Sequence, residues 1–515
     1  MGQTEKKKKK GVQKSKSNKS VKQKYKPNKT FSGVMYILEI LQIITAVGFF
    51  IYFYEMNMWP VKYLLYVSVA VAVVFLIAMI LKRWKWGCIV SLLLTIVMIV
   101  VQCAGIYFIN ITNDTIGEIT DKANTDTNVI CVLVLDENKA KTIQDAKEYN
   151  FGILKDLERE RTDETIKKIN SEVGTEIETT ECDNLLNLAA ALYSKKVDAI
   201  IINNAYVEII QEFEGYQNFE EMIRSIYANV ITERKEPEET KKTETKQFDI
   251  TKDAFNVYVS GIDVSGDVTT KSRSDVNIIM SINPSTKQIL LLSTPRDYYL
   301  PLSISSGVKD KLTHAGLYGV DVSIETLEML YGIDIDYYVR MNFTGFTDIV
   351  NILGGIEVYS EYSFSAKGYH FNAGYNKLYG EAALVFARER KSFAAGDNQR
   401  GRNQMEVIKA VIHKAENSSL LDNYASILES VSGCMQTDMT AKEISKLVKL
   451  QLGNNVEWNI QSYNVTGSGQ SQYTYTVPNA RAYVMEPNMD TVNEAKRLLN
   501  RVKLGKKLKK ADSEE

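Results

Sequence analysis

Residues 255–294 contain three short apolar runs separated by turn residues. The runs are F-N-V-Y-V-S-G-I-D at Phe255–Asp263, D-V-N-I-I-M-S-I-N at Asp275–Asn283 and Q-I-L-L-L-S-T at Gln288–Thr294. Each has the length and the β-branched composition of a buried strand. Segments with helical spacing follow at Val320–Tyr331, Leu378–Arg390 and Gln404–Glu416. Strands followed by helices predict an α/β domain, which begins near Phe248.

Charged residues stand where these predicted strands end or begin. They are Asp263, Asp275, Arg296 and Asp297. Catalytic groups commonly lie at such positions, on loops held by a rigid sheet. The simpler alternatives are a turn pair between Asp275 and Arg273 and another between Arg296 and its neighbour Asp297.

A second charged stretch, A-R-E-R-K-S-F-A-A-G-D-N-Q-R-G-R-N-Q at Ala387–Gln404, lies between two predicted helices. Its cations are Arg388, Arg390, Lys391, Arg400 and Arg402, and its acids are Glu389 and Asp397. Guanidinium groups match phosphate oxygens bidentately, so the stretch suits a diphosphate. The alternative is a solvated basic loop, or an arginine–carboxylate lattice that joins two helices.

Composition bounds the remaining possibilities. A chain of 515 residues predicts more than one domain, and a net charge of -1 gives it no global polyanion-binding character. The five cysteines show neither a C-x-x-C motif nor a Cys/His metal spacing. The three histidines are far apart in sequence, so we do not expect a histidine-rich metal site.

The amino-terminal part predicts a membrane anchor. Residues 1–29 are a lysine-rich arm that we expect to be disordered, and residues 30–110 contain three apolar stretches. These stretches, at 31–54, 61–81 and 86–109, are long enough to cross a hydrocarbon core of ~30 Å. Glu39 and Gln42 lie within the first stretch, where we interpret them as helix–helix contacts rather than as a functional site.

The distribution of positive charge predicts the orientation of this anchor. The basic arm, together with Lys82, Arg83 and Lys85, marks the cytoplasmic side. Three crossings then place everything after Asn110 outside the cell membrane. A lysine-rich arm also attracts anionic lipid of the bilayer.

Residues 120–232 predict a small accessory α/β domain. Apolar runs at Asn128–Asp136 and Val197–Asn203 flank two helical patterns, an order that fits a parallel sheet and resembles half of a periplasmic ligand-binding fold. No glycine fingerprint or ligand cluster is present, so we expect a spacer or a partner-binding domain. A charged linker (233–247) separates it from the main domain (248–503), and a charged tail (504–515) follows.

An ordered set of motifs in the main domain resembles the LytR-CpsA-Psr family. The motifs are G-I-D-V-S-G (261–266), R-S-D (273–275), S-T-P-R-D (293–297), K-L-T-H-A-G (311–316), I-D-Y-Y-V (335–339), L-G-G-I (353–356), A-L-V-F-A-R-E-R (383–390) and D-N-Q-R-G-R-N-Q (397–404). Each motif alone is weak, whereas the ordered set, over about Phe248–Leu452, is specific. The resemblance implies an α/β/α domain with a central mixed sheet that encloses a polyprenyl chain.

The resemblance also implies an activity and a set of site residues. Members of the family transfer glycans from polyprenyl diphosphate carriers to peptidoglycan, attaching teichoic acid, capsule or related wall polysaccharides of Gram-positive bacteria. Other envelope polysaccharide assembly proteins are then candidate partners of the accessory domain. Asp263 and Asp275 would then hold Mg²⁺. The residues implied to grip the diphosphate are Arg273, Arg296, Lys311, Arg388, Arg390, Arg400 and, through hydrogen bonds, Gln404. Asp397 would orient Arg400 or take the proton from the acceptor hydroxyl.

Several alternatives remain open at this stage. Lys311 has the properties of a solvated lysine, and His314 those of a packing residue. The same site would serve a polyprenyl diphosphate hydrolase, in which water replaces the acceptor hydroxyl, and a non-enzymatic scaffold for envelope polysaccharide synthesis would bind the same lipid. Nucleic acid is not an expected partner, because the predicted topology places the site outside and no helix-turn-helix or zinc pattern occurs.

Overall fold

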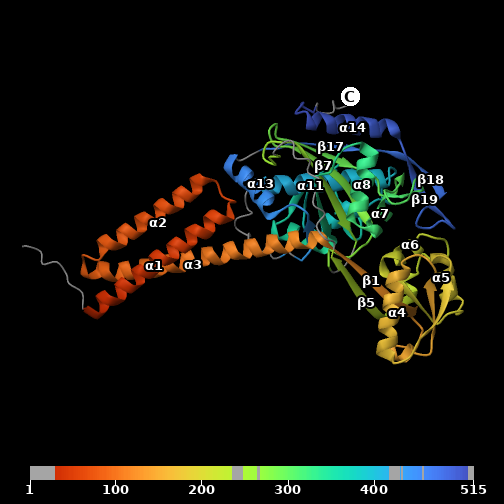
Figure 1. The fold of residues 1–515 in the computed structure, drawn as a ribbon. Coiled ribbons are helices and arrows are strands. Elements are labelled where there is room, and N and C mark those ends of the chain that lie inside the picture. Colours follow the sequence, from red (N-terminus) through yellow and green to blue (C-terminus); the bar gives the residue numbers. More distant parts are fainter. Residues whose placement is uncertain are drawn as a thin grey trace, which may run out of the picture. The chain divides into compact units, whose positions relative to one another are not determined.

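A computed structural model describes residues 29–234, 248–263, 267–416, 430, 433–454 and 457–508 (Figure 1). Outside these ranges lie most of the predicted basic arm, residues 235–247 of the predicted linker, residues 264–266 of the G-I-D-V-S-G motif and the end of the charged tail. The chain divides into two compact units, Met1–Glu55 with Val61–Tyr107, and Met56–Pro60 with Phe108–Glu515.

Three long helices carry the predicted membrane spans. They are α1 (Lys29–Met56), α2 (Val61–Leu81) and α3 (Lys85–Asp121), and each is long and apolar enough to cross a membrane. Gln42 is buried inside this bundle. Glu39 forms an ion pair with Lys82, which directly follows α2. The Thr45 hydroxyl donates a 2.6 Å hydrogen bond to Gln102 Oε1. Glu39 thus makes a contact of the expected kind, whereas Gln42 Oε1 has no hydrogen-bond partner among the described residues.

The accessory domain, residues 125–234, contains a five-stranded sheet in the order β3-β2-β4-β1-β5. Its strands are β1 (Thr125–Leu135), β2 (Asn150–Leu154), β3 (Glu178–Cys182), β4 (Ala199–Asn203) and β5 (Ile223–Arg234). β2 is parallel to β3 and β4, but β1 is antiparallel to both β4 and β5. The prediction of a parallel sheet came from the apolar runs that form β1 and β4, and for this pair it is wrong. β1 forms a long antiparallel ribbon with β5, and this ribbon lies beside β4.

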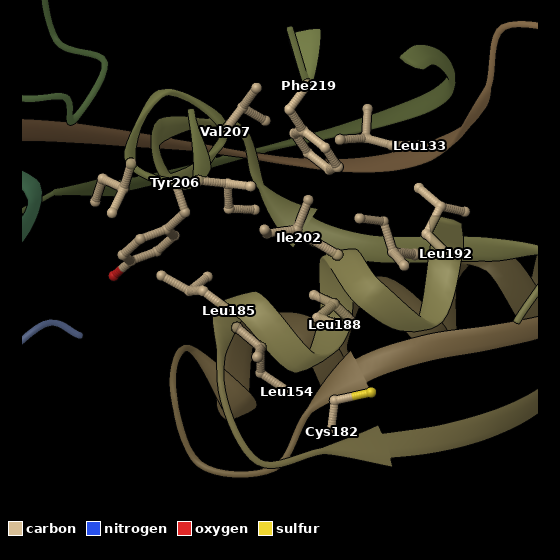
Figure 2. Packing of buried hydrophobic residues seen from close by; sticks show 14 of the residues in the cluster. Leu133, Leu154, Cys182, Leu185, Leu188, Leu192, Ile202, Tyr206, Val207 and Phe219 are labelled. Carbon is tan, nitrogen blue, oxygen red and sulfur yellow. The ribbon is translucent and has the colours of Figure 1, made fainter. Parts of the chain in front are cut away.

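Helices cover both faces of the accessory sheet. They are α4 (Arg159–Val173), α5 (Leu185–Tyr193) and the short α6 (Val207–Ile210). Alternate residues of β1 face opposite sides: Val132 packs in one cluster with Ile169 of α4, and Leu133 in another with Leu188 of α5. Figure 2 shows the second cluster, in which Phe219 and residues of α6 close the core. The position of α6 is therefore fixed by apolar burial.

The main domain is built on a six-stranded sheet in the order β16-β11-β6-β7-β8-β17. The strands are β6 (Phe255–Ile262), β7 (Ser274–Asn283), β8 (Gln288–Ser293), β11 (Tyr337–Asn342), β16 (Met435–Thr437) and β17 (Asn459–Asn464). The three predicted apolar runs form β6, β7 and β8, which pair antiparallel in sequence order. β11 and β17 pair in parallel with β6 and β8, respectively.

Both faces of this sheet are covered by helices, which accounts for its continuous apolar runs. Ile279 of β7 packs with Leu327 of α8 (Val320–Tyr331) and with α14 (Met489–Lys503). Ile278, the next residue, packs with Met405 of α11 (Asp397–Glu416) on the opposite face, where α13 (Ala441–Asn454) also lies. The predicted α/β class is confirmed.

Shorter elements complete the main domain. They are β9 (Tyr299–Pro301), β10 (Lys309–Lys311), α7 (Leu312–Tyr318), α9 (Phe343–Ile352), β12 (Ile356–Ser360), β13 (Phe364–Ala366), β14 (Tyr369–Phe371), β15 (Gly374–Leu378), α10 (Gly380–Arg388), β18 (Gly467–Tyr473) and β19 (Arg481–Pro487). β12 pairs with β15, and β13 with β14, as antiparallel ribbons. They form a small layer against α10, through contacts such as Phe371 with Phe386.

The charged stretch 387–404 differs from its predicted structure. α11 begins at Asp397 rather than at Gln404, so the second half of the predicted loop is helical. Residues 397–403 carry no apolar spacing, but Gln399, Arg400 and Asn403 are buried. This first part of α11 therefore packs through a polar face, and Arg400 and Gln404 lie one turn apart on it.

We expect Gly316→Ala to lower the free energy of unfolding by about 1–3 kcal/mol through overpacking. A Cβ atom on Gly316 would lie 2.5 Å from the Ser272 carbonyl oxygen and 3.0 Å from the Ser274 amide nitrogen. α7 would have to move away from the start of β7. Urea unfolding of the detergent-solubilised protein measures the change. Gly433→Ala is the control, because a Cβ there meets no heavy atom of the described residues within 4 Å. An equal loss in both variants would contradict the steric explanation.

Candidate active site

One cavity of about 430 Å³ in the main domain brings together most of the predicted site residues. Its charged and polar lining consists of Asp263, Arg273, Asp275, Arg296, Arg388, Arg390, Arg400 and Gln404. Its apolar lining includes Val276, Met280, Met341, Phe346, Leu384, Val407, Ile408, Val411 and Ile412. We refer to the five lining arginines as the arginine cluster.

The register of the sheet explains why these groups meet. β7 runs antiparallel to both neighbours, so its first residues lie beside the last residues of β6 and β8. Ser274 is opposite Ile262, and Ile278 is opposite Ser293. Asp275 at the start of β7 is thereby close to Asp263, which follows β6, and to Arg296, which follows β8.

The other wall comes from α10 and α11. Arg388 is the last residue of α10, and Arg390 follows it. Arg400 and Gln404 occupy the first turns of α11, and Val407, Ile408, Val411 and Ile412 continue the same face at helical spacing. β7 shows the same order of a charged residue followed by apolar ones, with Asp275 followed by Val276 and Met280. The cavity therefore has a charged end that continues into an apolar region.

Ion pairs fix the charged end. Arg296 Nη1 donates to both carboxylate oxygens of Asp275 at 2.9 Å, and Arg388 pairs with Asp263. Burial opposes ionisation of Asp275, but Arg296 and Arg273 outweigh it and hold the pKa of this carboxyl below its usual range. Asp275 thus pairs with Arg296, which follows β8. A local turn pair with Arg273 does not by itself describe the contacts of Asp275.

Two cavity-lining arginines have an unused donor. The Nε atoms of Arg273 and Arg296 are buried and have no hydrogen-bond partner within the described ranges. Asp297 Oδ2 lies 3.7 Å from Arg296 Nε, beyond hydrogen-bond range. A buried donor without a partner is costly, and an anion bound in the cavity would satisfy both.

Two predicted site residues do not line the cavity. Lys311 is only 3% exposed at its side chain, and its Nζ donates to Glu212 of the accessory domain at 2.5 Å. Asp397 is buried in an ion pair with Arg400. Burial raises the pKa of Asp397, and Arg400 offsets this effect only in part. Asp397 is therefore placed to hold Arg400.

Arg402 and His314 have structural contacts and do not face the cavity. Arg402 does not line the cavity; it donates to Gln399 and lies 3.4 Å from Glu361. His314 is fully buried, with its Nδ1 2.7 Å from Asp310 Oδ1, which fits a packing and hydrogen-bonding residue.

The sequence did not indicate two carboxylates that reach the arginine cluster. Glu208 and Glu212, in and just after α6 of the accessory domain, both bind Arg273. They precede Arg273 by 65 and 61 positions, so no local pattern links them to it. Glu212 also lies beside Lys311. Burial opposes its ionisation, but Lys311 and its other cationic neighbours lower the pKa of Glu212 to about 2.

The donor chemistry fits Mg²⁺ only together with a bound anion. Asp263 and Asp275 line the cavity and present the oxygen ligands that Mg²⁺ prefers. Among the described residues, no group of three or more His, Cys, Asp or Glu side chains is placed to hold a metal ion. Phosphate oxygens and water would have to complete the coordination shell, as is common for this ion.

Comparison with known proteins gives a consistent set of relatives. A model of the LytR_cpsA_psr family matches residues 222–494. The polyisoprenyl-teichoic acid--peptidoglycan teichoic acid transferase TagU of Halalkalibacterium halodurans is 35% identical over 225 residues, 43% of this chain and 73% of that protein. TagU of Bacillus subtilis is 34% identical over 216 residues, 41% and 69% of the respective chains. A solved structure of YwtF (TagT) with bound octaprenyl pyrophosphate has a TM-score of 0.38 and 29% identity, and covers 50% of this chain and 93% of that one.

We expect Asp275→Asn to lower the free energy of unfolding by about 3 kcal/mol at pH 7, because it leaves Arg296 buried without its counter-charge. In this variant the free energy of unfolding should also depend less on pH in the acid range. The folded protein holds the pKa of Asp275 below its ordinary value of about 3.9, so this group stabilises the fold above that pH. The contribution is lost as the pH falls and the unfolded chain takes up the proton first.

Urea unfolding at pH 7, 5 and 3 measures both effects. The difference between wild type and Asp275→Asn should shrink from pH 5 to pH 3. A difference that stays constant or grows would contradict the ionised buried pair. Asp198→Asn is the control for a carboxylate whose side chain only accepts from an exposed strand-end amide.

Proposed function

The chain belongs to the LytR-CpsA-Psr family of transferases, and we propose how its cavity carries out the transfer of a polyprenyl-linked glycopolymer to peptidoglycan. The observation that carries the proposal is the continuity of the arginine cluster with an apolar region in one cavity. A polyprenyl diphosphate has the same two parts, a charged head and a long hydrocarbon chain. The proposal places the head at Arg273, Arg296 and Arg388, and the chain against α11.

The arginine cluster supplies the electrostatic part of the mechanism. Arg296 and Arg273 each present a buried Nε–H toward a bound anion, and Arg388, Arg390 and Arg400 add charge from the opposite wall. Phosphoryl transfer requires positioning and charge neutralisation more than covalent catalysis. Donors fixed by packing need no reorganisation as charge develops on the phosphate oxygens.

The acceptor is the hydroxyl of a peptidoglycan sugar. Its oxygen attacks the phosphorus that carries the glycan, a new phosphorus–oxygen bond forms, and the bond to polyprenyl phosphate breaks. Polyprenyl phosphate leaves with the bonding electrons, and the cations stabilise its new charge. The proton of the attacking hydroxyl passes to the leaving phosphate, directly or through water. Asp397 holds Arg400 in this scheme. Gln404, one turn along α11, donates its amide to the donor oxygens.

Asp263 and Asp275 would hold Mg²⁺ against the diphosphate. When bound, the ion would neutralise charge on the phosphate oxygens and polarise the bond that breaks. The two carboxylates also orient Arg388 and Arg296, so each has a role in the protein alone.

The membrane helices give the site access to a lipid substrate. We infer that the amino terminus is cytoplasmic and that the main domain is extracellular, because Lys82 and Arg83 lie between α2 and α3 on the same side as the basic arm. Peptidoglycan, the acceptor of the curated relatives by name, is outside the membrane, which agrees with this orientation.

A reporter fusion tests the orientation. Alkaline phosphatase fused after Ile250 should be active, because it folds only outside the cytoplasm, whereas a fusion after Arg83 should be inactive. An inactive alkaline phosphatase after Ile250 would overturn the three-span topology.

We expect Arg296→Ala to lower the transfer rate at least about 100-fold, since it removes a fixed donor at the phosphate. The assay combines the full-length protein in nanodiscs with Mg²⁺, a polyprenyl diphosphate-linked glycan and peptidoglycan oligomers. Glycan-bearing peptidoglycan and polyprenyl phosphate are both quantified. A parallel reaction with a chelator, restored by added Mg²⁺, tests the metal.

Arg402→Ala is the matched control, because Arg402 lies on the same helix as Arg400 but does not line the cavity. It should keep the wild-type rate. If the wild-type protein releases free glycan phosphate and no glycan-bearing peptidoglycan, water is the acceptor and the protein is a hydrolase. If the lipid binds and neither product forms, the scaffold function replaces the enzyme.

A further inference from the structure

The accessory domain contacts the cavity wall through two carboxylates. Glu212 accepts from Arg273 Nη1 at 2.7 Å, and Glu208 accepts from Arg273 Nη2. Glu212 Oε2 also accepts from Lys311 Nζ at 2.5 Å. Arg273 lines the cavity, and its side chain is only 12% exposed. A domain with no assigned role therefore contacts a member of the arginine cluster directly.

This contact rests on a packed interface. Val207 and Ile210 of α6 are buried in the accessory core, and the same cluster includes Leu317, Val477 and Ala482 of the main domain. The base of the accessory sheet is also joined to the main domain, where the Thr127 amide donates to the Thr269 carbonyl at 3.0 Å. Apolar burial and backbone hydrogen bonds hold the two carboxylates in place.

The accessory domain takes up only some of the donors of Arg273. A guanidinium group has five N–H donors, two on each terminal nitrogen and one on Nε. Glu212 and Glu208 take up one edge, through Nη1 and Nη2. The Nε atom is buried, with no hydrogen-bond partner among the residues the structure describes. The Nε–H is thus a donor that neither carboxylate uses.

A second route leads from the accessory domain to Arg296. Glu212 binds Lys311, Lys311 Nζ lies 3.5 Å from Asp297 Oδ1, and Asp297 Oδ2 lies 3.7 Å from Arg296 Nε. Lys311 is buried between Glu212 and Asp297, and both carboxylates compensate its charge. Glu212 therefore contacts Arg273 directly and is linked to Arg296 through Lys311 and Asp297.

We propose that the accessory domain is part of the active site, and that Glu208 and Glu212 are positioning residues which turn the Nε edge of Arg273 toward the donor diphosphate. The proposal rests on the proposed function for the identity of the ligand. It assigns to the accessory domain a role in donor recognition, through arginine geometry rather than through direct contact with substrate. Glu212 also holds Lys311, whereas Glu208 holds Arg273 alone.

Binding measurements on the full-length protein in nanodiscs test this role. The probe is geranylgeranyl diphosphate with Mg²⁺, and the variants are Glu208→Gln, Glu212→Gln and the control Glu214→Gln, an exposed carboxylate of the same segment. Glutamine keeps the size of the side chain and removes the charge. We expect Glu208→Gln and Glu212→Gln to weaken binding about tenfold, as is usual when a supporting partner is removed, with Glu214→Gln unchanged.

Geranylgeraniol separates positioning from folding. This alcohol has the hydrocarbon chain and no phosphate, so its affinity should be the same in wild type and in both site variants. Weakened binding of both probes would mean a general loss of structure and would overturn the proposal. Because Glu212 compensates buried Lys311, that variant is the less stable one; Glu208→Gln, at a half-exposed carboxylate, provides the test that keeps the fold.

The sign of the effect decides between positioning and competition. Tighter diphosphate binding in Glu208→Gln would mean that the carboxylate competes with the donor, and unchanged binding would mean that it does not act on the site. Either result overturns the proposal. In the transfer assay, positioning raises the KM for the donor and leaves that for peptidoglycan unchanged. A wild type that binds the probe and transfers nothing would overturn the proposed function while the binding test still stands.

Discussion

The ion pair between Asp275 and Arg296 is the interaction on which the site depends. It joins the start of β7 to the segment after β8, so it holds together the strand ends from which the charged residues project. Both side chains are nearly nine-tenths buried, and neither charge could remain there without the other. The same pair leaves the Nε of Arg296 without a hydrogen-bond partner in the part of the chain that the structure describes. A structural ion pair therefore prepares a donor for a ligand, and the antiparallel register of β6, β7 and β8 determines where that donor lies.

Sequence reasoning succeeded where the signal is local. The β-branched runs predicted β6, β7 and β8, and the motif set predicted the residues that line the cavity. It failed where tertiary structure overrides local preference. The first turns of α11 are polar and lack helical apolar spacing, yet they form a helix because Gln399, Arg400 and Asn403 are buried against the site. In the accessory domain, β3 (E-T-T-E-C) is a short, largely exposed strand with no apolar run, so the pattern revealed too few strands to determine their directions.

The carboxylates of the site came from two kinds of source. Asp263, Asp275 and Asp397 belong to motifs that could be recognised, although only Asp397 has its cationic partner nearby in sequence. Glu208 and Glu212 arrive from another domain, and only the folded chain brings them to Arg273 and Lys311. Counted together with Asp297, the six carboxylates equal the six cations Arg273, Arg296, Lys311, Arg388, Arg390 and Arg400. A diphosphate would add negative charge to a cluster that is already formally neutral, which is a physical reason for a divalent cation at this site.

The apolar region of the cavity has a consequence for carrier exchange. Its wall, formed by residues such as Met280, Val407 and Val411, offers only apolar side chains to the hydrocarbon chain of the proposed substrate. The loaded donor and the spent polyprenyl phosphate have the same chain. Burial of that chain stabilises both complexes equally, so it cannot help the enzyme to release one and admit the other. The whole distinction arises at the arginine cluster, where the spent carrier has one phosphate fewer. Product inhibition and the rate of turnover are consequently decided by the charged end of the cavity, however tightly the lipid is held.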